Sequence, residues 1–82
     1  MTIVVLYFAA VRELLGKTEE TLSLSPGPWT IDGLAKHLVE RYPALGPHLG
    51  SVRFALNEDF VNGSATVAEG DRVALLPPVS GG

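Results

Sequence analysis

The sequence predicts an α+β fold in which a mixed sheet of four or five strands carries one main helix across a single face, with a short extra helix beside it. Two observations predict it. A long segment with helical spacing lies at residues 31–42, and a much shorter one lies at residues 9–16. Strand-like apolar runs surround them, at residues 2–8, 19–25, 52–57 and 72–76. Because one long helix covers only one face of such a sheet, the other face is expected to stay open.

The first strand-like run has large apolar residues at every position from 3 to 8, which predicts a strand that is apolar on both faces and therefore central in its sheet. Val11, Leu14 and Leu15 then repeat at helical spacing, and Gly16 can adopt the left-handed conformation that closes a helix. In the run at residues 19–25, leucines alternate with hydroxyl-bearing residues, which is typical of a strand with one wet face.

The main helix has clear start and stop signals. The segment "PGPW" at residues 26–29 predicts a turn, and Thr30 can then cap the helix. Pro43 ends it. One apolar stripe is expected to face the sheet, formed by Ile31, Leu34, Ala35, Leu38, Val39 and Tyr42.

The last third of the chain is expected to be mostly strand. Residues 43–50 predict a loop, followed by the strand at residues 52–57. The dipeptide Asn62-Gly63 predicts a two-residue hairpin turn. "AEGD" at residues 68–71 predicts the turn before the final strand at residues 72–76.

Length and composition limit the class of protein. A chain of 82 residues makes one domain and buries roughly 60–70% of its unfolded surface, which suffices for one small core. The absence of cysteine excludes disulfides and thiolate sites and suits a cytoplasmic protein. With a net charge of −3 and scattered basic residues, we expect no nucleic-acid partner. The apolar stretch at residues 2–11 is too short to span a bilayer and lacks the flanks of a secretion signal, so no membrane partner is expected.

The sequence shows no catalytic or metal-binding set. His37 is expected to be solvated on the polar side of the main helix and His48 to be solvated in a loop, and their spacing matches no metal site. Glu58 and Asp59 are expected to serve a turn. The segment "LLGKT" at residues 14–18 lacks the upstream glycine of a phosphate-binding loop and precedes a strand.

The open face of the sheet is expected to carry apolar side chains. In the final strand Val73 and Leu75 point one way, while Arg72, Ala74 and Leu76 point the other way. An uncovered apolar face commonly marks a surface for a partner protein. We therefore interpret this face as a partner surface.

The chain is expected to divide into a domain at residues 1–76 and a flexible tail at residues 77–82. Pro77 and Pro78 end the strand ladder and stiffen the exit of the tail. Without a Cβ atom, Gly81 and Gly82 can enter a narrow channel, and Gly82 presents an unhindered acyl carbon. The six tail residues can span up to about 20 Å, which is enough to reach a site on a partner.

Two segments carry a specific resemblance. "LYFAAVRELLG" at residues 6–16 and "GDRVALLPPVSGG" at residues 70–82, with a helix of the right size between them, resemble the small subunits of molybdopterin synthase, or molybdopterin converting factor subunit 1. These are sulfur carriers with the ubiquitin-like β-grasp fold. The resemblance covers essentially the whole chain, although Leu75 and Leu76 stand where members often carry an aromatic pair.

The resemblance implies a chemistry for Gly82. A terminal carboxylate is ionised at pH 7 and is a poor electrophile, so it must first be activated. In the family, an adenylating enzyme of the ubiquitin-activating type uses ATP to join AMP to the terminal glycine. A sulfur donor protein then displaces AMP and leaves a thiocarboxylate. The large synthase subunit binds the tail and transfers the sulfur to cyclic pyranopterin monophosphate, and two transfers form the molybdopterin dithiolene.

The resemblance also implies how the work is divided in a heterotetramer. Gly82 is the reacting group, Gly81 gives the tail access to the partner's site, and the catalytic groups belong to the large subunit. This chain would bind no cofactor, since ATP is used by the activating partner. The interface with partners is expected at Phe8, Phe60, Leu76, Pro77, Pro78, Val79 and Ser80. For Phe8 and Phe60, packing in the core is the alternative.

Three other functions stay open. A carrier in the thiamine pathway would use the same chemistry with a thiazole synthase, although such carriers are usually shorter. A ubiquitin-like modifier would leave Gly82 in isopeptide linkage to lysines. An adapter that uses only its sheet face would tolerate loss of the tail.

Overall fold

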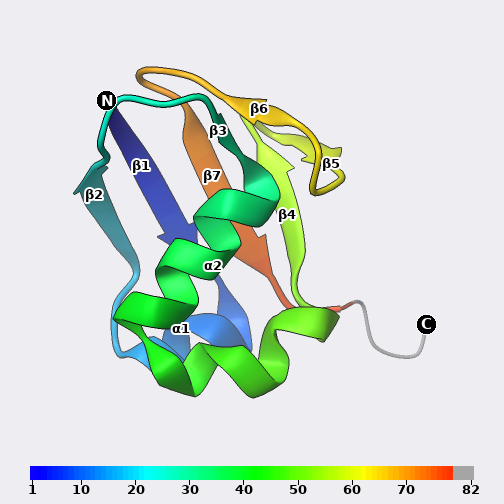
Figure 1. Cartoon of the computed structure of the whole chain (residues 1–82). Helices are drawn as coiled ribbons and strands as arrows, with labels where there is room; N and C mark the ends of the chain where they lie inside the picture. The colour runs from blue at the N-terminus through cyan, green and yellow to red at the C-terminus, as the bar shows by residue number, and fades with distance from the viewer. Residues whose placement is uncertain (79–82) are drawn as a thin grey trace.

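The computed structural model describes residues 1–78. A five-stranded sheet has the order β2-β1-β7-β4-β5, and α2 (Ile31–Arg41) lies across one of its faces (Figure 1). β7 runs parallel to β1 on one side and antiparallel to β4 on the other. The strands are β1 (Thr2–Tyr7), β2 (Glu19–Ser23), β4 (Arg53–Leu56), β5 (Asp59–Val61) and β7 (Arg72–Leu76). The predicted α+β fold, with β1 in the interior of a mixed sheet, is confirmed.

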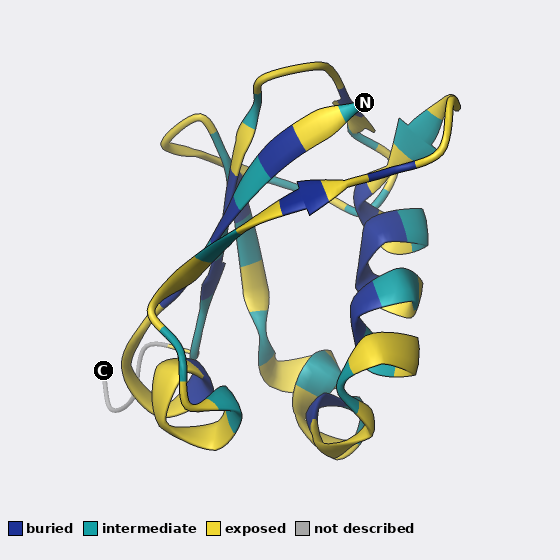
Figure 2. Cartoon of the chain, turned by 90° about the vertical axis from the view of Figure 1, so that its left-hand side faces the viewer, coloured by how far each residue is buried: buried dark blue, intermediate teal, exposed yellow. Residues whose placement is uncertain are grey.

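The core fills the space between α2 and the sheet, and Figure 2 shows buried residues on the surfaces that face each other. Thr30 caps α2 as predicted, because its Oγ1 accepts a hydrogen bond of 3.1 Å from the amide of Gly33. The buried side chains that α2 and the two central strands contribute are Ile31, Leu34, Ala35, Leu38, Ile3, Val5, Tyr7, Val73 and Leu75.

The short helix α1 (Ala9–Leu15) is also confirmed, and it closes as the sequence predicts. Gly16 has a φ of 72°, in the left-handed region, and its amide donates to the carbonyl of Arg12 over 2.8 Å. Val11 is the buried residue of this helix. α1 lies at the end of the sheet where β1 terminates (Figure 1).

The prediction of a loop at residues 43–50 is wrong, because these residues belong to a 3-10 helix, η1 (Pro43–Ser51). Pro43 stands at its start, where the fixed φ of proline suits a helix and no amide hydrogen is needed. Leu45 is fully buried and anchors η1 to the core. Two prolines and two glycines favour an irregular segment, whereas the burial of one leucine orders it.

The predicted hairpin at Asn62-Gly63 is also wrong. The two-residue turn lies at Asn57-Glu58, between β4 and β5, and both residues have positive φ, at 49° and 76°. Gly63 instead packs against the start of α2. Its carbonyl accepts from the amide of Asp32 over 2.9 Å, and a Cβ there would overlap the Asp32 carboxylate. The segment after β5 therefore leaves the main sheet to cap the helix.

That segment then forms a second, two-stranded sheet that was not predicted. It pairs β3 (Trp29–Thr30) with β6 (Thr66–Val67) in antiparallel fashion. The sequence predicts a turn at Trp29, but its backbone pairs with Val67 and its indole nitrogen donates to the carbonyl of Ser25 over 2.9 Å. The predicted turn at residues 68–71 is confirmed, and Gly70 in it has a φ of 81°.

The face of the sheet opposite α2 carries no helix among residues 1–78, as predicted (Figure 2). The side chains on this open face come from alternate positions of the strands, while their neighbours point into the core. None of the helices within residues 1–78 has the length and apolar character needed to cross a membrane.

Candidate functional site

The tail root, which we define as residues 76–78, lies at the end of the central strand β7. β7 ends at Leu76, and the amide of Phe8 donates to the carbonyl of Leu75 over 3.2 Å. Pro77 and Pro78 follow, and neither has an amide hydrogen with which to extend the ladder. Leu76 and Pro77 are half-buried, and Pro78 is exposed. The sheet therefore fixes the point at which the chain leaves the domain.

Four of the predicted site residues lie outside the described residues: Val79, Ser80, Gly81 and Gly82. The structure accordingly describes the surface around the tail root, and the roles expected for these four residues stay predictions. The same is true of the division of the chain at residue 76.

The predicted interface aromatics are on the surface, so core packing is excluded for both. Phe8 is 42% exposed and Phe60 is 57% exposed. Phe60 lies on the open face, in one row of the sheet: it pairs with Ala55, Ala55 pairs with Ala74, and Ala74 pairs with Leu6. Leu76 lies on the same face, directly opposite Arg53. The structure thus brings Phe60 and Leu76 together on two sides of β4.

Sequence reasoning missed Arg53. Its guanidinium carbon lies 4.3 Å from the centre of the Phe60 ring, within the range of a cation–π contact. Ala55, beside this pair, is 7% exposed even though no helix among the described residues crosses its face. Phe60 is the cross-strand neighbour of Ala55, so the Arg53–Phe60 pair lies directly beside this buried position.

A second apolar surface lies on another side of the tail root. A cavity of about 400 Å³ opens between α1, the end of η1 and the two prolines. Leu14, 38% exposed, lines it together with His48. Its other lining residues include Val11, Val52, Pro77 and Pro78. The cavity depends on η1, which is why a loop prediction for residues 43–50 did not reveal it.

The two histidines differ in their surroundings. His48 is exposed as expected, but His37 is half-buried, with its ring edge-on to Trp29 at a centroid distance of 5.5 Å. The expectation of a fully solvated His37 is therefore wrong. Within residues 1–78, no three side chains of the His, Cys, Asp or Glu type gather as metal ligands.

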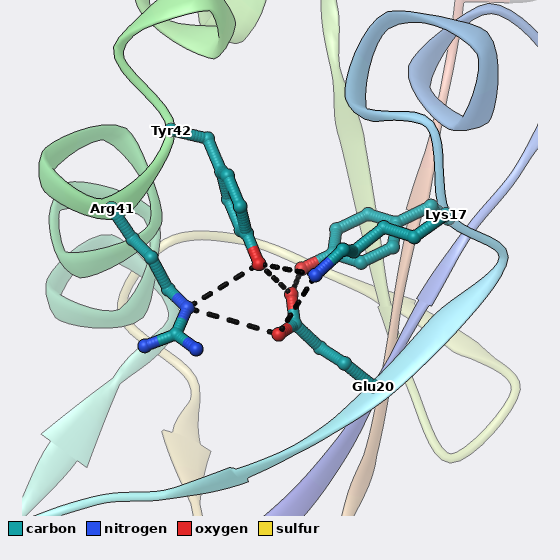
Figure 3. Close-up of polar contacts among 5 residues, drawn as sticks. Lys17, Glu20, Arg41 and Tyr42 are labelled. Atoms are coloured by element: carbon teal, nitrogen blue, oxygen red, sulfur yellow. Dashed lines mark hydrogen bonds and ion pairs between the residues drawn. The ribbon is translucent and has the colours of Figure 1, made fainter.

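A polar cluster around Glu20 lies on the other side of the sheet, between β2 and the end of α2 (Figure 3). One carboxylate oxygen of Glu20 accepts hydrogen bonds from the hydroxyls of Tyr7 and Tyr42. The other oxygen lies 3.6 Å from the ammonium of Lys17 and 3.7 Å from Nε of Arg41. Tyr42 in turn accepts from Lys17 over 2.8 Å.

These contacts set the ionisation of the cluster. Burial acts to raise the pKa of Glu20, but the two phenol hydrogen bonds and the two nearby cations outweigh it, so the pKa is lowered. Burial, and then the hydrogen bond to Glu20, raise the pKa of Tyr7. Glu20 thus stays ionised as the acceptor. The cluster lies on the helix side of the sheet, away from the surfaces at the tail root. The role of the cluster is therefore structural: it holds β2 against the end of α2.

The fold and the similarity of the chain to known proteins define the class of protein. The structure matches SAMP1 from Haloferax volcanii with a TM-score of 0.86 at 26% identity, over the whole of both chains. It also matches a complex of subunits 1 and 2 of the molybdopterin-converting factor from Helicobacter pylori, with a TM-score of 0.71 at 24% identity over the whole of both chains. The fold is the ubiquitin-like β-grasp.

The sequence comparisons give the family. The model of the ThiS family matches residues 5–82. The molybdopterin synthase sulfur carrier subunit of Chlamydomonas reinhardtii is 42% identical over 84 aligned positions, which cover all of both chains. The chain belongs to the ThiS family and, within it, to the molybdopterin synthase sulfur carrier subunits.

Proposed function

We propose that this chain is the sulfur carrier subunit of molybdopterin synthase and that Gly82 carries the sulfur. The end-to-end similarity to the Chlamydomonas subunit carries the proposal, because it includes the tail as well as the domain. The geometry supports it. The central strand β7 leads directly into Pro77 and Pro78, so the sheet fixes the point at which the chain leaves the domain, beside the surface that a partner would contact.

The proposed chemistry takes place on the acyl group of Gly82. A carboxylate oxygen of Gly82 attacks the α-phosphate of ATP in the adenylating partner and releases pyrophosphate. The acyl adenylate is then a good electrophile, because AMP is a stable leaving group. Sulfide supplied by a sulfur donor protein displaces AMP and leaves the thiocarboxylate. This chain binds no cofactor in the process, and we place the process in the cytoplasm.

Delivery takes place in the large subunit. The thiocarboxylate sulfur bonds to a carbon of cyclic pyranopterin monophosphate in place of one of that carbon's oxygen substituents, and water then cleaves the acyl–sulfur bond and restores the carboxylate of Gly82. Two deliveries supply both sulfurs of the dithiolene. We assign the large-subunit interface to the open face and the tail, through Phe8, Phe60, Leu76, Pro77, Pro78, Val79 and Ser80. The exposure of Phe8 and Phe60 supports this assignment.

The test is reconstitution from purified adenylating enzyme, sulfur donor, large subunit and pterin precursor. The intact mass of this chain should rise by the difference between sulfur and oxygen after the first two proteins act. Deleting Gly82, or adding one residue after it, should abolish that shift and dithiolene formation while the circular dichroism spectrum stays unchanged. Dithiolene formation by the deletion variant would refute the proposal.

Three further assays separate the remaining alternatives. A thiamine-pathway carrier would support a thiazole synthase instead of the large subunit. A protein modifier would appear in higher-mass conjugates on a blot of the native cell extract. An adapter would keep its binding partner after loss of residues 77–82, and it would acquire no sulfur.

A further inference from the structure

The contact between Arg53 and Phe60 holds a cation in a fixed place on the open face. Arg53 lies on β4 and Phe60 on the neighbouring edge strand β5. The guanidinium carbon lies 4.3 Å from the ring centre, and a planar guanidinium stacks well on an aromatic ring. The stack orders a long side chain that would otherwise lose conformational entropy when it meets a partner.

This ordered cation stands beside the tail root. Arg53 pairs directly with Leu76, the last residue of β7, and Pro77 comes next in the chain. A partner that contacts the chain at Leu76 and Pro77 therefore lies close to Arg53. Phe60, at 57% exposed, and the half-buried Leu76 offer it apolar area on either side of Arg53.

The charge of Arg53 is not neutralised within residues 1–78, where no carboxylate lies within 4 Å of its guanidinium. Arg41 and Lys17 differ, since both form ion pairs with Glu20. Glu19 also lies on the open face, but it is on β2, which β1 and β7 separate from β4. Although the net charge of the chain is −3, the open face near the tail therefore presents a cation among apolar side chains.

We propose that Arg53, stacked on Phe60, is a specificity-determining residue that pairs with a carboxylate of the large subunit beside the tail. The proposal rests on the proposed function, which supplies that partner. The surface it fits has an apolar centre that meets Leu76 and Phe60, with an Asp or Glu at its edge. The guanidinium fork can bind such a carboxylate through two parallel hydrogen bonds.

The experiment measures the affinity and association rate of the purified large subunit for full-length variants of this chain. Arg53→Gln should weaken binding by about tenfold or more at about 50 mM salt, mainly through slower association, and by less at about 500 mM salt, where charges are screened. Arg53→Lys should give an intermediate loss, because it keeps the charge but not the fork. The matched control is Lys36→Gln, which removes the same charge from an exposed position on α2 and should change binding by less than about twofold.

The results distinguish this inference from the proposed function. If the wild-type chain does not bind the large subunit, the proposed function itself fails. If the wild type binds and Arg53→Gln binds equally well, or if Lys36→Gln weakens binding as much, the inference alone is wrong. A loss that is the same at both salt concentrations would also overturn it, since that would indicate lost packing and not a charge pair.

Discussion

The hydroxyl of Tyr42 donates a hydrogen bond of 2.7 Å to Glu20 and so ties the end of α2 to the edge strand β2. The side chain of Glu20 is only 12% exposed. If its carboxylate turned toward water, the hydroxyls of Tyr7 and Tyr42 would both lose their hydrogen-bond acceptor. The cluster around it joins segments that are 13 and 22 residues apart in the sequence. It is therefore a tertiary contact on which the packing of the helix against the sheet depends.

We expect Glu20→Gln to lower the free energy of unfolding by about 1–3 kcal/mol, because two phenols lose an ionised acceptor and two cations lose their partner. Urea denaturation at pH 7 measures this. Glu19→Gln is the matched control, since Glu19 is exposed and on the same strand, and it should change stability by less than about 0.5 kcal/mol. Equal losses in the two variants would contradict a specific role for Glu20.

The same residue predicts a pH dependence. The pKa of Glu20 is lower in the folded protein than in the unfolded chain, so its ionised form stabilises the fold above the unfolded-state pKa. This contribution is lost as the pH falls through the folded-state pKa. The difference in unfolding free energy between the wild type and Glu20→Gln should therefore be largest near about pH 6 and shrink toward about pH 3. A difference that stays constant over this range would show that the charge of Glu20 has no part in it.

Ala9 predicts a stabilising substitution. It follows Phe8 at the start of α1 and has a φ of 47°, in the left-handed region that costs a residue with a Cβ about 1–2 kcal/mol. Ala9→Gly removes this cost but adds unfolded-state entropy, so we expect unchanged stability or a gain of up to about 1 kcal/mol. Ala10→Gly, one residue further into the helix, should lose about 0.5–1 kcal/mol. Thermal unfolding of both variants tests this, and similar losses would contradict the strain at Ala9.

Much of the fold could be predicted because local patterns and tertiary packing agree. The stripe on α2, the left-handed Gly16 and the alternation in β7 each follow from the sequence. The hairpin prediction failed because, at that point of the chain, the local pattern and the tertiary packing disagree. Asn62-Gly63 has the residues of a tight turn, but Gly63 is needed beside Asp32, and the turn with positive φ lies at Asn57-Glu58 instead.

Some residues of the candidate site could be predicted from the sequence, but the contacts between them could not. The resemblance identified Phe60 and Leu76, and the strand alternation placed Leu76 on the open face. The contact of Arg53 with Phe60 and that of Glu20 with Tyr42 both join separate elements, so no local pattern in the sequence indicates them. They depend on sheet order and on where each helix ends, which only the folded chain defines.

Leu76 tests whether the open face is the interface. We expect Leu76→Asp to weaken the complex with the large subunit by at least about tenfold, because it places a charge in the apolar area beside the tail root. Leu76 is half-buried, and its side chain lies outside the core, so the variant should still fold, with a loss of about 1 kcal/mol. Co-elution with the large subunit measures the complex, and circular dichroism checks the fold. Thr21→Asp is the control, since Thr21 is exposed on the same face, on the edge strand β2, where it pairs with Val4, and it should leave co-elution intact. Normal co-elution of Leu76→Asp would place the interface elsewhere, and the cavity between α1, η1 and the two prolines would then be the next surface to mutate.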